Sequence, residues 1–206
     1  MPVITVSRMF GSNGSEVAER VAQMLGWHFF DNDLIDAVAE RAGLTHDEVA
    51  SREERVPSIV ERLASALALG SPEILPPPNV ESSEDHLVSV TNRVIEEAVQ
   101  AGPAVFVGRG AQALLAHRED ALHVFCYAPK SALRRWAMQR FEILAEEADR
   151  LVSDTNRQRE QYVKRHWQRN WLAFDNYHLC LNTSWLGIDE AAQIIVETAR
   201  RHLDAE

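Results

Sequence analysis

Near its start the chain reads Val3-Ile4-Thr5-Val6-Ser7-Arg8-Met9-Phe10-Gly11-Ser12-Asn13-Gly14-Ser15, a short β-branched run followed by a turn of small residues. Such a run is typical of a buried strand. Apolar residues then recur at helical spacing, at Val17, Val21, Met24 and Leu25, until Gly26, which is a helix stop signal. The segment therefore predicts a strand, a glycine- and serine-rich loop and a helix, in that order.

A loop of this kind can hold phosphate. Its backbone N–H groups face the incoming anion, and the helix that follows adds the positive end of its dipole. We predict that the nucleotide-binding residues are Ser7, Gly11, Ser12, Asn13, Gly14 and Ser15. An ordinary strand-to-helix turn is the alternative. The pattern G-x-x-x-x-G-K-S/T is not met, because Ser15 or Gly14 stands where the lysine belongs.

The rest of the chain alternates strand and helix patterns. Further strands are predicted at 27–30, 104–107, 122–127 and 178–181, and helices at 84–101, 131–172 and 188–203. This alternation predicts an α/β fold with a mainly parallel sheet and helices on both faces. Polar loops follow three of the strands, at 7–15, 108–110 and 182–184. Because ligands bind beyond the carboxyl ends of parallel strands, these loops predict the site.

Composition excludes several classes of function. The 206 residues include 21 Lys and Arg against 31 Asp and Glu, a net charge of −10, which argues against non-specific nucleic-acid binding. Apolar stretches are far shorter than the roughly 20 residues of a membrane span. We expect a cytoplasmic protein with neither nucleic acid nor a membrane as partner. Cys126 and Cys180 lie in apolar runs, and we expect both to be buried strand residues.

Several segments together resemble the cytidylate-kinase-like family, bacterial P-loop relatives of nucleoside monophosphate kinases. The resemblance rests on residues spread over nearly the whole chain: Val3–Ala18 with Leu25-Gly26 and Phe30-Asp31, Gly108-Arg109-Gly110-Ala111, Val124–Pro129, Asp154-Thr155-Asn156-Arg157, and Tyr177–Thr183 with Leu186. Two features depart from true cytidylate kinases. The Walker lysine is absent, as in the resembled subfamily generally, and Gly110 replaces the acid of their Gly-Arg-Asp motif.

The resemblance implies a P-loop NTPase-type three-layer sandwich: a five-stranded parallel sheet with a helical substrate-binding insertion and a helical lid. The chain would be one kinase-like domain. Its core would comprise about 1–31, 101–130 and 173–206, its insertion about 32–100 and its lid region 131–172. The implied activity is ATP-dependent phosphorylation of CMP or dCMP, with Mg²⁺. Small-molecule nucleotides would be the partners.

Phosphoryl transfer requires cations around the phosphates, and arginine provides them with bidentate geometry. Arg8 is the candidate substitute for the lysine, and Arg109 for holding the acceptor phosphate. In the lid, Arg157 and Arg159 are candidates to reach the transferring phosphate, with Arg157 foremost because it occupies the resembled motif position. Each has a surface or salt-bridge role as its alternative.

The remaining candidate roles concern substrate and metal. Asp31 would bind the acceptor's sugar or base, or cap the following helix. Arg55 and Arg62 would hold the acceptor phosphate, or lie on the surface. Ser15 or Glu16 lies nearest the usual position of the metal-binding hydroxyl, and Ser15 is the candidate magnesium ligand. The late tryptophans Trp136, Trp167, Trp171 and Trp185 are expected to pack between helices, with base stacking or a homodimer contact as alternatives.

Two other functions stay open from the sequence. The missing lysine favours a nucleotide-binding regulatory module that has lost transfer, whereas the many lid arginines favour catalysis. A P-loop kinase for another small acceptor is the third interpretation. Turnover with nucleoside monophosphates, with another acceptor, or with none distinguishes the three.

Overall fold

The computed structural model describes residues 1–31, 34–35 and 84–203. The chain divides into two compact units, one made of 1–31 with 102–206 and the other of 32–101. The first unit holds the sheet and the loops that the sequence singles out. Of the second unit, the structure describes chiefly one helix.

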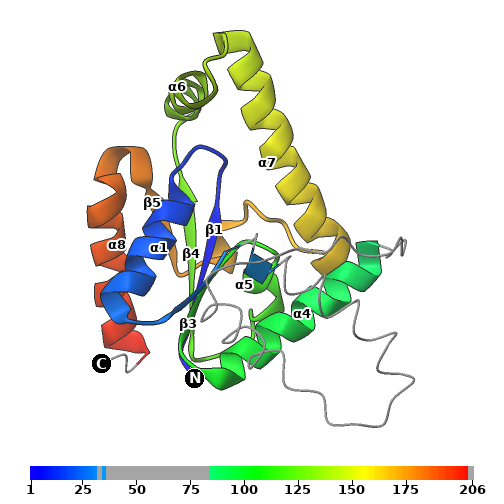
Figure 1. Ribbon diagram of the computed structural model, residues 1–206, viewed down its shortest axis with the longest axis vertical. Helices are drawn as coiled ribbons and strands as arrows, with labels where there is room; N and C mark the ends of the chain where they lie inside the picture. Colours follow the sequence, from blue (N-terminus) through cyan, green and yellow to red (C-terminus); the bar gives the residue numbers. More distant parts are fainter. Residues whose placement is uncertain (32–33, 36–83, 204–206) are drawn as a thin grey trace, which may run out of the picture. The chain divides into compact units, whose positions relative to one another are not determined.

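The first unit contains a five-stranded parallel sheet in the order β2-β3-β1-β4-β5, which confirms the predicted fold class (Figure 1). Strand β1 lies in the middle of the sheet, and its Val3, Ile4 and Val6 are almost wholly buried, as its β-branched sequence predicts. The strands are β1 (Val3–Arg8), β2 (His28–Phe30), β3 (Ala104–Val107), β4 (Ala121–Tyr127) and β5 (Leu179–Asn182).

Helices cover both faces of this sheet. Helices α1 (Gly14–Leu25) and α8 (Thr183–His202) lie side by side on one face (Figure 1), where Val17 and Ile195 belong to one apolar core with the strands. The opposite core includes Phe125, Trp171 and Tyr177. The remaining elements of this unit are α5 (Ala111–Leu114), α6 (Lys130–Phe141), α7 (Ala145–Trp167) and the 3₁₀ turn η1 (Phe174–Asn176).

Two expectations about local structure are wrong. The continuous helix at 131–172 is instead α6 and α7, because Glu142 and Gln168 adopt left-handed backbone (φ 56° and 57°) that no glycine or proline announces. The predicted helix at 188–203 forms the main part of α8, and the non-helical Gly187 (φ 79°) separates it from a short helical turn that begins at Thr183. Cys180 lies on the edge strand β5 and is exposed. Cys126 is buried, as expected.

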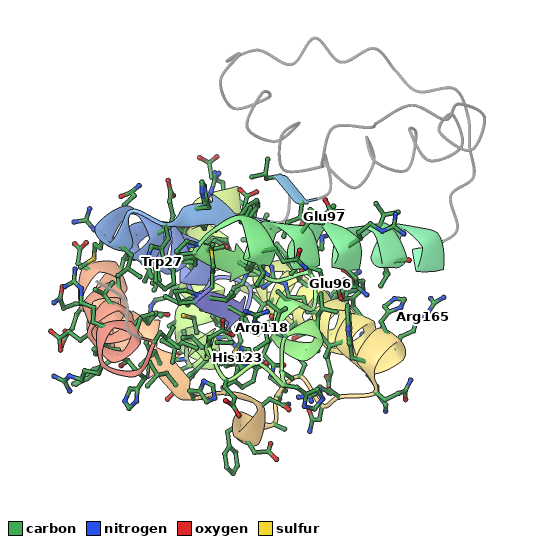
Figure 2. All side chains as sticks on the ribbon, turned by 90° about the horizontal axis from the view of Figure 1, so that it is seen from below. Trp27, Glu96, Glu97, Arg118, His123 and Arg165 are labelled. Atoms are coloured by element: carbon green, nitrogen blue, oxygen red, sulfur yellow. The ribbon has the colours of Figure 1, made fainter. Side chains whose placement is uncertain are left out.

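Helix α4 (Glu84–Ala101) is the described helix of the second unit and matches the predicted helix at 84–101. Its buried side chains recur three or four residues apart, at Val90, Val94, Ile95, Ala98 and Val99. Glu96, labelled in Figure 2, lies on the exposed side. Arg55, Arg62 and most of the predicted insertion 32–100 lie outside the described residues.

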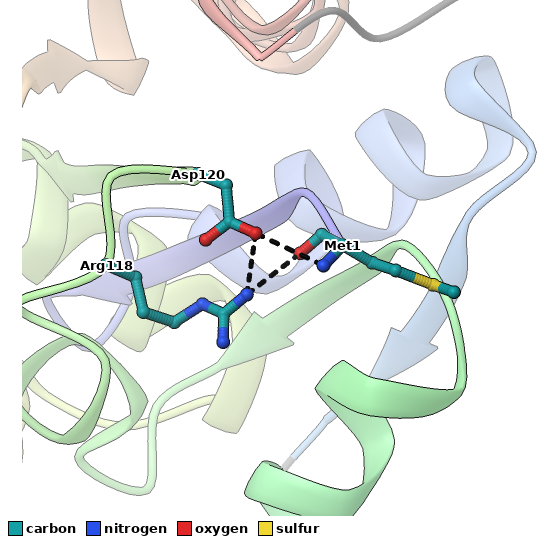
Figure 3. Close-up of polar contacts among 3 residues, drawn as sticks. All are labelled: Met1, Arg118 and Asp120. Carbon is teal, nitrogen blue, oxygen red and sulfur yellow. Dashed lines mark hydrogen bonds and ion pairs between the residues drawn. The ribbon is translucent and has the colours of Figure 1, made fainter.

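A polar network fixes the start of the sheet (Figure 3). The N-terminal ammonium lies 3.2 Å from a carboxylate oxygen of Asp120, and Arg118 donates to the same oxygen at 2.6 Å and to the Met1 carbonyl at 3.3 Å. Partial burial alone raises the pKa of Asp120, but the hydrogen bonds from Arg118 and the ammonium outweigh it and leave the pKa lowered. The network therefore joins the first residue to the segment before β4.

His123 carries a titratable group inside the sheet (Figure 2). Its Nδ1 lies 2.7 Å from the Thr5 hydroxyl, and its ring stacks on His178 at 5.2 Å. Burial, followed by repulsion from His178, lowers the pKa of His123 to about 4. In the folded state this imidazole is therefore neutral well below the pH at which it protonates in the unfolded chain.

His123 predicts a loss of stability in mild acid. Between pH 6.5 and 4 the unfolded chain binds the His123 proton and the folded chain does not, so stability falls as the pH falls through this window. We expect His123→Gln to lose less stability over it than the unchanged protein, by up to about 3 kcal/mol. Urea unfolding at both pH values measures this difference. The exposed His117→Gln is the control, and equal slopes for His123→Gln and the unchanged chain would contradict the assignment.

Candidate active site

The loop that joins β1 to α1 is shaped by its backbone. Gly11 has a φ of 84°, and a Cβ there would lie 2.8 Å from the Trp136 indole of α6. Asn13 is left-handed (φ 54°), and its side chain does not cap α1. The first N–H groups of α1 therefore have no side-chain cap from Asn13, which is the arrangement that suits a bound anion.

Hydroxyl groups hold this loop against the neighbouring strands. The Ser12 hydroxyl donates to the carbonyls of Met9 at 2.8 Å and Cys126 at 3.2 Å. The Thr183 hydroxyl donates to the Ser12 carbonyl and, at 3.2 Å, to the Tyr127 carbonyl. Ser12 thus contributes backbone rather than a free side chain, and the loops at 7–15 and 182–184 meet as predicted.

Arg8 lies across the start of α1. A Cβ at Gly14 would lie 2.5 Å from the Arg8 Cβ and 2.8 Å from the Cys126 Cβ, so only glycine lets the arginine pass here. The Arg8 Nε donates to the Ser15 hydroxyl at 3.3 Å. The structure therefore brings together the two residues that the sequence assigned to the missing lysine and the metal.

Two arginines from distant parts of the chain, Arg109 and Arg159, lie close enough to Arg8 to repel its charge. Burial, then repulsion from Arg159 and Arg109, lowers the pKa of Arg8 to about 9, with Asp31 acting in the opposite direction. Burial also lowers the pKa of Arg159, to about 10. The guanidinium groups of Arg8 and Arg159 are still charged near neutral pH. A polyanion bound among them would relieve the repulsion.

One face of α7, in the predicted lid region, contacts the loop. Arg159 donates to the Arg8 carbonyl at 2.7 Å, and its guanidinium carbon lies 5.7 Å from the centre of the Phe10 ring. Asn156 accepts a hydrogen bond from the Phe10 N–H at 2.8 Å. Arg157 lies elsewhere, with a 67% exposed side chain paired to Asp154 at 2.8 Å. Asn156 was not among the predicted site residues, although it stands in the motif that resembles the family's lid.

The segment after β3 has an unusual backbone. Gly108, Arg109 and Gly110 all have positive φ, of 73°, 47° and 70°. A Cβ at Gly110 would lie 2.2 Å from the Trp167 indole, which itself packs against Tyr162 and His166. Arg109 is thus held in a left-handed conformation, between two glycines, where it influences Arg8.

Gly110→Ala is expected to destabilise the protein by about 2–3 kcal/mol. About 1 kcal/mol comes from the positive φ, and the rest comes from displacing the Trp167 ring. Gly26→Ala is the control, because Gly26 has a similar φ of 67° with nothing within 4 Å of the added carbon. Urea unfolding measures both changes. Equal losses for the two variants would contradict the proposed steric contact.

Comparison with known proteins shows the family and the fold of this chain. The model of the cytidylate kinase-like family matches residues 3–185. The chain belongs to this family. No curated protein matches it. Among the solved structures it is similar to an uncharacterized protein from Eubacterium ventriosum, with a TM-score of 0.71 and 16% identity over the whole of both chains.

Two kinases share the fold at greater distance. A gluconokinase from Sinorhizobium meliloti has a TM-score of 0.56 and 12% identity, over 98% of this chain and 94% of that one. A shikimate kinase from Acinetobacter baumannii, solved with shikimate, has a TM-score of 0.52 and 15% identity, over 98% and 94%. These identities show the kinase fold alone.

The other residues predicted to have a role in this cytidylate kinase-like chain are Ser7, Asp31 and the tryptophans. Ser7 lies within β1, and its side chain is buried. Asp31 follows β2 and influences Arg8. Trp185 is 81% exposed, so the expectation that it packs between helices is wrong, while Trp136 and Trp167 pack on the two glycine loops.

Among residues 1–31, 34–35 and 84–203, no three His, Cys, Asp or Glu side chains are grouped as a metal site requires. No helix in the same ranges is long and apolar enough to cross a membrane.

Proposed function

We propose that this protein transfers a phosphoryl group from ATP to a nucleoside monophosphate, with CMP or dCMP as the first candidate. The observation that carries the proposal is the convergence of Arg8, Arg159 and Arg109 on an uncapped glycine loop at the carboxyl edge of a parallel sheet. Membership of the cytidylate kinase-like family supports the same reaction and the same acceptor.

The chemistry needs positioning and charge neutralisation rather than a base, because the acceptor phosphate is already anionic. In our proposal the N–H groups from Gly11 to Ser15 hold the donor phosphates. Arg8 replaces the lysine, and Arg159 stabilises charge on the transferring group. Arg109 holds the acceptor phosphate, and Asp31 contacts the acceptor's sugar or base.

Magnesium fits this site through few protein ligands. The Ser15 hydroxyl, which accepts from Arg8, keeps a lone pair for a metal and is the proposed ligand. Nucleotide phosphates and water would supply the remaining ligands, as Mg²⁺ prefers. When bound, the ion neutralises charge on the donor phosphates.

The other parts of the chain take roles in substrate capture. We assign the substrate-binding insertion to 32–100, where Arg55 and Arg62 would hold the acceptor phosphate, and the lid region to 131–172. The core is then 1–31, 101–130 and 173–206. A cytoplasmic location and a homodimer stay predictions.

One observation favours a different small acceptor. Gly110 occupies the place of the acid in true cytidylate kinases, and Trp167 fills the space that any side chain there would need. The fold is shared with a gluconokinase and with a shikimate kinase, whose acceptors are not nucleotides. The third hypothesis is a regulatory module without phosphoryl transfer. The charge of Arg8 at the loop argues against it.

ADP formation distinguishes these functions. The purified protein is mixed with ATP and Mg²⁺ and, in separate reactions, with CMP, dCMP, UMP, AMP, GMP, gluconate, shikimate or no acceptor. The proposal expects the fastest turnover with CMP or dCMP. Turnover with gluconate or shikimate alone would establish the second candidate. ATP binding with no turnover in any reaction would favour the regulatory module.

A further inference from the structure

We propose that Asn156 is a positioning residue, which docks α7 on the phosphate loop and so places Arg159. This inference rests on the proposed function for its catalytic consequence. Its structural part stands on the contacts of the loop itself.

The Asn156 contact has a defined polarity. The Phe10 N–H is a donor, so only the side-chain oxygen of Asn156 can accept it, at 2.8 Å. Phe10 directly precedes Gly11, whose φ of 84° begins the turn of the loop. The contact joins residues 146 positions apart in the chain. It therefore fixes the shape of the loop and the position of α7 together.

Arg159 lies three residues beyond Asn156, on the same face of α7. Its guanidinium donates to the Arg8 carbonyl at 2.7 Å and lies 5.7 Å from the Phe10 ring centre. The two residues thus contact consecutive parts of the segment 8–10. With Asn156 in place, the rotation of α7 about its axis is set, and Arg159 is held next to Arg8.

The start of α7 is tied down separately. Arg134 of α6 donates two hydrogen bonds to the carboxylate of Asp149, at 2.8 Å and 2.6 Å. This pair joins α6 to α7 but makes no contact with the phosphate loop. Asn156 accepts a hydrogen bond from the loop backbone, and Arg159 donates one to it. These contacts therefore hold α7 in one orientation against the loop, which preorganises Arg159.

The catalytic test uses Asn156→Ala, with Asn156→Leu as a second variant of nearly the same size as asparagine. We expect kcat to fall by about 10- to 50-fold while the KM for ATP changes less than about threefold, since Arg159 is misplaced rather than removed. Gln158→Ala is the control, an exposed amide two residues away, and should leave kcat unchanged.

A double variant separates positioning from a general structural role. If Asn156 acts through Arg159, adding Asn156→Ala to Arg159→Met lowers kcat no further. Multiplicative losses in the double variant would overturn the proposal, and so would an unchanged kcat in both Asn156 variants.

A third measurement needs no transferase activity. Without nucleotide, Asn156→Ala should raise the hydrogen-exchange rate of the Phe10 amide at least about tenfold, with Gln158→Ala unchanged. Binding of inorganic tripolyphosphate should change less than about threefold, in line with the small change expected in the KM for ATP. Unchanged exchange at Phe10 would overturn the docking. Faster exchange in a protein that turns over no acceptor would instead count against the proposed function alone.

Discussion

Arg159→Met is expected to lower kcat by about 10³-fold, whereas Arg157→Met on the same helix should change it less than about twofold. Arg159 donates to the loop backbone beside Arg8, so its positive charge lies where charge develops on the transferring phosphoryl group. Arg157 is 67% exposed and paired with Asp154. Steady-state kinetics with saturating ATP and acceptor measures both variants.

The results for this pair of variants distinguish two orientations of α7, which differ in the face that the helix presents to the loop. Methionine keeps much of the aliphatic length of arginine, and both proteins should melt at nearly the temperature of the unchanged chain. A large loss in Arg157→Met with a small one in Arg159→Met would mean that α7 rotates to present its exposed face during the reaction. Equal small losses of kcat would show that neither Arg157 nor Arg159 contributes to catalysis.

Arg8→Met should abolish most of the transfer without destabilising the protein. The methionine retains the contact over Gly14 and Cys126, while the charge repelled by Arg159 and Arg109 is removed. We expect kcat/KM for ATP to fall by about 10²- to 10³-fold. The midpoint of thermal unfolding without nucleotide should stay the same or rise slightly. Tripolyphosphate binding, measured by calorimetry, should weaken in parallel.

Arg20→Met is the matched control for Arg8→Met. Arg20 belongs to an exposed ion pair with Asp189, and such pairs contribute little to stability. Both kinetics and the unfolding midpoint should be nearly unchanged in this variant. Near-normal turnover in a folded Arg8→Met protein would refute the idea that Arg8 replaces the Walker lysine.

The sheet and its loops could be predicted because the signals are local. Val3, Ile4 and Val6 form a β-branched run that becomes the buried central strand, and the glycines after it mark the turn. The polar loops at 7–15 and 182–184 follow from parallel topology alone. The ends of α6 and α7 could not be predicted, because neither Glu142 nor Gln168, which adopt left-handed backbone there, is a residue type that signals a turn.

The contacts of the site depend on docking that no local pattern encodes. A helical repeat does not tell which face of α7 meets the loop, so the motif put Arg157 first, while the structure places Asn156 and Arg159 there. The contact of Gly110 with Trp167 joins positions far apart in the chain. A glycine at a motif position could be noticed, but the ring that requires it could not.

Formation of CDP or dCDP tests the central claim most directly. The unchanged protein and Arg8→Met are incubated with ATP, Mg²⁺ and CMP or dCMP, and the nucleotides are separated and identified by mass spectrometry. Our account predicts the nucleoside diphosphate and ADP in equal amounts with the unchanged protein, and almost none with Arg8→Met. ATP binding without any nucleoside diphosphate, or the same yield from both proteins, would contradict it.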